Sequence, residues 1–238
     1  MQRIKLVAIG AVEGAVILAL IHWVGAWAAW LTIAVIWWLH TRTAESAIER
    51  ATWAIALASL VVVATINGNI IGQAIVVAGY ALWQFGKQYY PKSTQFQVAQ
   101  AGWLEFMALM ATFGAEAVWR WPVALILIMV YAASLAIALD FFTDGGRAVR
   151  ALAATWGLIV TEASLVFSIW LVNYVLPHGV LLIPQPAVVI TAIGYCFGSI
   201  YLAHAGSKLS KGRLAEYAII GLCLVVIVIA GTRWSGAI

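Results

Sequence analysis

Four glutamates inside long apolar segments are the residues of this sequence best suited to chemistry. Glu13, Glu105, Glu116 and Glu162 each interrupt a run of apolar residues, and neither Lys nor Arg occurs near the centre of any such run. A carboxylate at the centre of a membrane span costs about 2.5–3.5 kcal/mol on insertion scales, so its presence calls for a reason. Proton and cation paths are built from buried carboxyls, so these glutamates are candidate site residues.

One expected helix, over 97–118, carries three of the polar side chains on one face. Glu105 and Glu116 are eleven residues apart, a spacing that returns a helix to within about 20° of its starting direction. Thr112 falls on the same face, and Arg120 continues the stripe. The spacing therefore predicts a polar face that could line a path for a proton or a cation.

Two other helices are expected to contribute to the same path. Eleven residues join Glu162 to Asn173 on the helix that begins near residue 149. Glu13 lies beside Gly10 and Gly14, a small-residue pair that lets a neighbouring helix approach closely. The predicted ion or proton pathway therefore consists of Glu13, Glu105, Thr112, Glu116, Glu162 and Asn173.

A purely structural role is the main alternative for these carboxyls. A protonated glutamic acid can hydrogen-bond to a carbonyl or hydroxyl group of a neighbouring helix and only fix the packing. Glu116 and Arg120 are four residues apart, as in an ordinary helical ion pair. Because desolvation disfavours the charged form, we expect Glu13 and Glu162 to be protonated at neutral pH.

The segments that carry these residues predict an all-α polytopic membrane protein. Apolar residues make up 65% of the chain and charged residues 9%, and the apolar runs approach the length that crosses a bilayer. The runs lack the alternation of barrel strands, so each must be a helix. We expect one integral membrane domain over 1–238 with nine spans, over 4–22, 24–40, 51–66, 69–86, 97–118, 122–142, 149–176, 186–206 and 213–232.

The positions of the basic residues predict the orientation. With a cytoplasmic N-terminus, every Lys and Arg except Arg120 and Arg233 falls on the cytoplasmic side. Short cytoplasmic loops retain an excess of Lys and Arg, so the C-terminus is expected outside. The two short spans that meet at Asn67-Gly68-Asn69 could instead form a re-entrant hairpin, which would leave every charge on the same side.

Neither a cofactor, a metal site nor a catalytic residue is expected. Retinal needs a lysine in the middle of a helix, and all lysines lie at span ends or in loops. Histidines that could pair around a haem or a pigment lie near the membrane surfaces, and their ligation is left open: His22, His40, His178 and His204. The basic loops favour anionic lipid headgroups as partners, and nucleic acid is not expected.

Two stretches resemble known families. Asp144-Gly145-Gly146-Arg147-Ala148 resembles the start of the CDP-alcohol phosphotransferase signature, but Phe141, Thr161 and Leu165 stand where that family has aspartates, so its metal site cannot assemble. The last third carries, in order, Glu162, Pro177, Tyr195, Gly198, Leu209, Glu216-Tyr217 and Trp234. That order resembles a family of small multi-pass prokaryotic membrane proteins of unknown function. The resemblance implies a helical fold in a prokaryotic plasma (inner) membrane, and no activity.

Three classes of function fit the sequence. The interior carboxylates favour an ion- or proton-coupled permease or channel. Small size, many Trp residues and the lack of a complete motif would also suit a non-catalytic structural or assembly subunit of a larger membrane complex. A lipid-modifying membrane enzyme would need a metal or nucleophile constellation that the sequence does not display, so an enzyme is the least favoured class.

Overall fold

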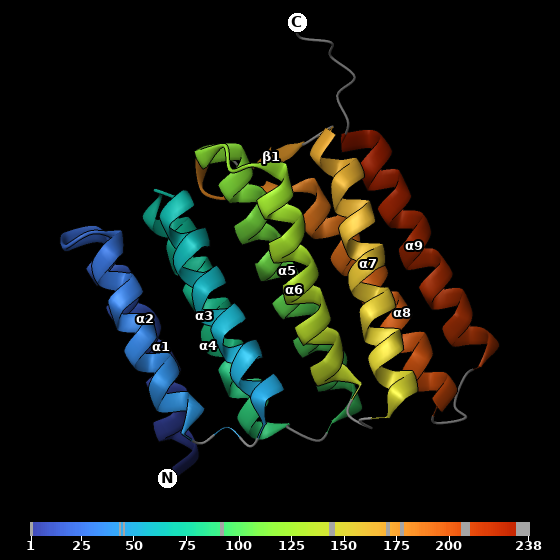
Figure 1. Cartoon of the computed structure of the whole chain (residues 1–238), viewed down its shortest axis with the longest axis horizontal. Coiled ribbons are helices and arrows are strands. Elements are labelled where there is room, and N and C mark those ends of the chain that lie inside the picture. Colours follow the sequence, from blue (N-terminus) through green and yellow to red (C-terminus); the bar gives the residue numbers. More distant parts are fainter. Residues whose placement is uncertain are drawn as a thin grey trace, which may run out of the picture.

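The computed structural model is a bundle of α-helices that lie side by side and alternate in direction (Figure 1). The structure describes residues 2–42, 44, 46–90, 93–142, 146–169, 172–176, 179–205 and 210–231. These ranges contain nine helices: α1 (Gln2–Trp23), α2 (Ala26–Thr41), α3 (Ala47–Ile66), α4 (Ile70–Tyr89), α5 (Thr94–Trp119), α6 (Val123–Phe141), α7 (Arg147–Ile169), α8 (Gln185–Ala205) and α9 (Lys211–Gly231). The predicted all-α class is confirmed, whereas Asp144, Gly145, Pro177, His178, Leu209, Arg233 and Trp234 lie outside the described residues.

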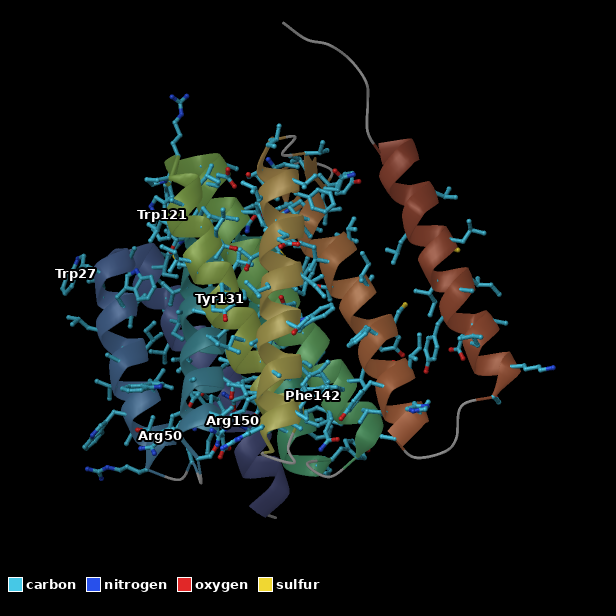
Figure 2. All side chains as sticks on the ribbon, turned by 45° about the vertical axis from the view of Figure 1, so that its right-hand side comes forward. Trp27, Arg50, Trp121, Tyr131, Phe142 and Arg150 are labelled. Carbon is cyan, nitrogen blue, oxygen red and sulfur yellow. The ribbon has the colours of Figure 1, made fainter. Side chains whose placement is uncertain are left out.

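Four of the described helices are long and apolar enough to cross a membrane by length and composition: α3, α6, α7 and α8. Shorter apolar stretches occur at Ile9–Trp23, Ala26–Thr41 and Leu214–Leu224. Arg50 and Arg150 lie toward one end of the bundle, and Trp121 lies toward the other (Figure 2). We call the end with Arg50 and Arg150 the basic end.

α5 is the central helix of the bundle. It packs against α3, α4, α6 and α8, whereas α1 and α2 form one edge and α9 packs on α8 at the other (Figure 1). Its N-terminus is capped by Ser93, whose hydroxyl accepts the Phe96 N–H at 3.5 Å, and it ends at Arg120 in a left-handed conformation with φ of 54°. Met107, Leu109 and Phe113 of α5 are almost fully buried in the main apolar core. The polar residues Glu105 and Thr112, which lie on this stretch of α5, are therefore placed in the interior.

The segment after α7 differs from the prediction. The sequence suggested one helix over 149–176, but α7 ends at Ile169, and β1 (Asn173–Val175) pairs antiparallel with β2 (Leu182–Pro184). Short apolar runs rich in Val, Tyr and Leu fit a strand as well as a helix, so periodicity alone could not separate the two. This segment forms a strand because it pairs with residues that lie seven or more positions further along the chain.

A buried asparagine holds this hairpin against the helices. Asn67, directly after α3, donates from its amide to the Val63 carbonyl at 2.8 Å and accepts the Leu182 N–H at 2.7 Å. The turn between α3 and α4 therefore serves as an anchor for β2. The two helices that flank this turn, α3 and α4, have 20 residues each. Each is therefore about 30 Å long, which is close to the thickness of a bilayer core.

Three pairs of glycines four residues apart have different packing partners. Gly10 and Gly14 pack against Gln84 and Val77 of α4, as the sequence predicted. Gly194 and Gly198 face the aromatic rings of Trp156 and Phe141. In the third pair only Gly72 is packed, and its neighbour is the Val180 carbonyl in the hairpin loop, not another helix; a Cβ at Gly68 would meet nothing within 4 Å.

The contrast within this third pair gives a stability test. Gly72→Ala should lower the free energy of unfolding by about 1–3 kcal/mol, because the new methyl group would overlap a backbone carbonyl that cannot rotate away. The measurement is SDS-induced unfolding in mixed micelles. Gly68→Ala is the matched control and should leave stability unchanged or slightly raised. Equal losses in both variants would show that the hairpin does not pack on Gly72.

Candidate functional site

Glu13 accepts three hydrogen bonds from two neighbouring helices. His40 Nε2 of α2 lies 3.1 Å from Oε1, while Gln84 Nε2 and the Tyr80 hydroxyl of α4 lie 2.7 Å and 3.2 Å from Oε2. We call these four residues the Glu13 cluster. An ionised carboxylate only accepts, so three converging donors suit the charged form. The geometry thus differs from the protonated Glu13 that burial alone suggested.

Two features bring the Glu13 cluster together: a glycine, Gly10, and an axial offset between α1 and α2. A Cβ on Gly10 would lie 2.6 Å from Gln84 Oε1, so glycine at this position lets α1 approach α4 closely enough for Glu13 to reach it. The first turns of α1 project beyond the other helices (Figure 2). Glu13 is consequently level with His40, one residue before the end of α2, and not at the centre of the bundle. The axial offset between α1 and α2 therefore gives Glu13 a basic partner, His40, which the sequence did not place at the same depth.

Aromatic stacking joins the Glu13 cluster to an ion pair. The His40 ring stacks on Trp53 of α3, with centroids 4.0 Å apart and planes at 5°. Lys87 Nζ lies 4.6 Å from the centroid of the same Trp53 ring and 3.0 Å from Glu49 Oε1. A cation over an aromatic face is attracted by its quadrupole, so Trp53 couples the two polar groups. The cluster is therefore connected with the basic end.

Asp140 extends this polar region to α6. Its Oδ2 accepts a hydrogen bond from Gln100 Nε2 of α5 at 3.0 Å, and the charges of Lys87 and Glu49 act on it across the bundle. This carboxyl is absent from the predicted pathway because it lies at the end of its apolar run. Tyr80 and Gln84 were also missed, although with Lys87 they follow the i, i+4, i+7 spacing of one helix face.

Glu105 occupies a second, separate interior position. It is 4% exposed, and its Oε1 accepts a hydrogen bond from the Ser134 hydroxyl of α6 at 2.6 Å. Its other oxygen, Oε2, is buried and has no hydrogen-bond partner. Because buried polar atoms are almost always paired, this orphan acceptor is an unusual feature of the site.

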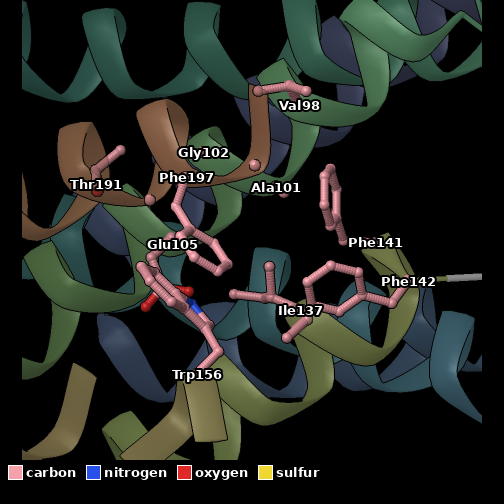
Figure 3. Close-up of a pocket in the computed structure, with 13 residues that line it drawn as sticks. Val98, Ala101, Gly102, Glu105, Ile137, Phe141, Phe142, Trp156, Thr191 and Phe197 are labelled. Atoms are coloured by element: carbon pink, nitrogen blue, oxygen red, sulfur yellow. The ribbon is translucent and has the colours of Figure 1, made fainter. Parts of the chain in front are cut away.

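A cavity of about 50 Å³ opens beside Glu105 (Figure 3). Residues of α5, α6, α7 and α8 line the cavity, and most of the atoms that face it are carbon atoms. Thr191 Oγ1 on α8 is the other buried polar atom without a partner among the lining residues. Figure 3 shows Phe141 and Phe197 on either side of the opening, with Ile137 between them and Trp156 next to Glu105.

The predicted polar face of α5 does not form a continuous path. Thr112 is buried, but its hydroxyl donates to the Ala108 carbonyl of its own helix at 2.9 Å. Glu116 lies about one turn beyond Thr112 and has a buried Oε2 without a partner, whereas Arg120 is exposed beyond the end of the helix. Apolar side chains fill the space between these groups, so Glu105 acts apart from them.

The other two predicted pathway residues, Glu162 and Asn173, do not lie in the interior of the helix bundle with Glu105. Glu162 lies on an exposed face of α7, so its surroundings are lipid or solvent and not the bundle interior. Asn173 is in β1, and the expected alignment of Asn173 with Glu162 on one helix is wrong because the helix has already ended. The tertiary arrangement thus separates residues that a longer helix would have aligned.

No set of three His, Cys, Asp or Glu that could hold a metal ion is found among the described residues. His22 and His204 are exposed near the ends of α1 and α8, and His40 faces Glu13. No family model, curated protein or solved structure matches this chain. The family resemblance of the last third of the chain stays a prediction, and function has to be inferred from the site itself.

Substitution of two buried serines tests how much the hydrogen bond between Ser134 and Glu105 contributes to stability. Ser134→Ala should cost about 1–3 kcal/mol in the free energy of unfolding, because it leaves both oxygens of a buried carboxyl without a donor. Ser164→Ala is the control: Ser164 is fully buried but its hydroxyl has no partner, so nothing is lost. SDS unfolding measures both. If Ser134→Ala is as stable as Ser164→Ala, Glu105 does not depend on Ser134.

Proposed function

We propose that this protein is a multi-pass integral membrane permease or channel coupled to protons, in which Glu13 takes up and releases the proton. The observation that carries this proposal is the 3.1 Å contact between Glu13 Oε1 and His40 Nε2. A carboxylate and an imidazole at hydrogen-bond distance can exchange a proton between them. Tyr80 and Gln84 hold the carboxylate in place, so the exchange does not require the helices to separate.

Access to the cluster supports coupling from one side. The side chains of His40 and Glu13 keep 21% and 16% of their surface exposed, while Tyr80 and Gln84 behind them are nearly inaccessible. One turn further along α1, Ile17 is fully buried in the apolar core. A proton can therefore reach Glu13 from the basic end, and apolar packing blocks its passage to the opposite end in this conformation.

We further propose that all nine described helices cross the plasma membrane of a prokaryote, with the basic end cytoplasmic and the C-terminus outside. Helices that alternate in direction place successive loops at opposite ends (Figure 1), and the basic end holds Arg42 directly after α2 and Arg50 and Arg150 in the first turns of α3 and α7. The retention of basic loops in the cytoplasm supports this orientation. Anionic lipid headgroups are the partners that such loops would contact.

Proton flux through reconstituted protein tests the role of Glu13. In liposomes loaded with a pH-sensitive dye, a K⁺/valinomycin potential should drive protons in several times faster than in protein-free liposomes. Glu13→Gln should return the rate to that baseline, because the amide keeps the size of the side chain but cannot carry the proton. Glu162→Gln removes an exposed carboxyl of the same type and should keep the wild-type rate.

Two results would contradict the proposal. Wild-type protein that is folded but no faster than empty liposomes would favour the alternative of a non-catalytic subunit, in which the Glu13 cluster serves packing. A Glu13→Gln variant with the wild-type rate would show that protons take another route. Near-identical elution profiles of wild type and variants in size-exclusion chromatography ensure that only folded proteins are compared.

Orientation can be measured by cysteine labelling in intact cells. In a background with Cys196→Ala and Cys223→Ala, a membrane-impermeant thiol reagent added outside should label Gly68→Cys and should not label Gly212→Cys. Both positions tolerate a side chain, since a Cβ at Gly68 meets nothing within 4 Å and one at Gly212 only the Ser210 hydroxyl at 3.9 Å. Labelling confined to Gly212→Cys would reverse the proposed orientation, and labelling of both would contradict the crossing of the intervening helices.

A further inference from the structure

The cavity beside Glu105 combines one unsatisfied acidic oxygen with an aromatic lining. Glu105 Oε2 is buried, unpartnered and part of the cavity wall, so a ligand that entered would meet an acceptor that lacks a donor. Phe141, Phe142, Trp156 and Phe197 contribute aromatic rings from three different helices. We propose that this cavity binds a small organic ammonium ion, held by Glu105 and the surrounding aromatic rings.

The chemistry of the lining favours an organic cation over a metal ion. Na⁺ or Ca²⁺ would need about six oxygen ligands, whereas Glu105 Oε2 and Thr191 Oγ1 are the two buried side-chain oxygens without a partner among the lining residues. Aromatic rings stabilise cations through their electron-rich faces and suit methylated ammonium groups. An N–H of such a ligand donates to Oε2, while its carbon atoms contact Phe141 and Phe197.

The volume of the cavity sets the size of the ligand. A cavity needs roughly 10–15 Å³ to hold one water molecule. A cavity of about 50 Å³ therefore holds a ligand of roughly three to five non-hydrogen atoms. Trimethylammonium, with four, fits this range. Gly194 and Gly198 set the width, because a Cβ on either would lie 3.1–3.2 Å from the rings of Trp156 and Phe141 and would force them inward.

This inference deepens the proposed function, and its transport step rests on that function. A proton and an ammonium ion cannot both occupy the same oxygen of Glu105, so loading of the cation excludes protonation at that atom. If proton uptake at Glu13 is coupled to release of the cation from Glu105, the protein exchanges protons for small amines. Binding itself does not depend on flux and can be measured separately.

Saturation-transfer NMR with purified protein in deuterated detergent tests the binding. The methyl signal of trimethylammonium should show transfer that saturates with concentration, while tert-butanol, a neutral molecule of similar size, should show at least tenfold weaker binding. Glu105→Gln should weaken binding of trimethylammonium by at least tenfold, and Phe141→Leu by several-fold. Glu116→Gln, which removes a carboxyl of the same helix outside the cavity, should bind like the wild type.

The outcomes separate the two proposals. Absence of saturable binding to the wild type overturns the cavity assignment even if Glu13-dependent proton flux is present. Equal binding of tert-butanol, or unchanged binding to Glu105→Gln, also overturns it, because the carboxylate would not be the recognition element. Displacement of trimethylammonium by equimolar Na⁺ would overturn it in favour of a metal-ion site. Binding without any proton flux would leave the cavity assignment in place and overturn the proposed function.

Discussion

The Glu13 carboxylate, removed from bulk water and in need of donors, is the constraint on which the packing of the first four helices depends. A carboxylate in the interior is stable only if its oxygens are hydrogen-bonded, and here the donors come from α2 and α4. Close approach of α1 to α4 requires Gly10, and correct placement of His40 requires the stacking on Trp53. One desolvated charge thus decides how four helices fit together.

A second constraint, volume, organises the other half of the bundle. Several large aromatic side chains enter a helix interface where the facing helix has glycine, and this pairing recurs through the structure. The pairs are Gly79 with Trp103, Gly86 with Phe96, Gly157 with Tyr131, Gly194 with Trp156 and Gly198 with Phe141. Where aromatic rings from α6, α7 and α8 converge, their rigid shapes leave the cavity beside Glu105, since flat rings fill an irregular space less completely than flexible aliphatic chains.

The polar region at the basic end extends from the Glu13 cluster to α6. Asp140 follows the cavity residue Ile137 on α6 by three positions and precedes Phe141, while its carboxyl is within electrostatic reach of Lys87 and Glu49. Lys87 in turn lies over the Trp53 ring that stacks on His40. Ring stacking, a cation–π contact and the charges of Lys87 and Glu49 thus form a chain of contacts from the Glu13 cluster to Asp140.

The sequence alone determined the helical class, the approximate bounds of the helices and the presence of interior carboxyls, because these follow from local composition and from the cost of exposing backbone to lipid. Only the tertiary structure decided which carboxyls have partners. Glu13 meets His40 because of an offset between α1 and α2, Glu105 faces a cavity because of rings on three other helices, and Glu162 points away from the interior. A helical repeat states which residues share a face but not what that face contacts, since axial shifts and rotations of neighbouring helices are fixed by packing between residues far apart in the chain.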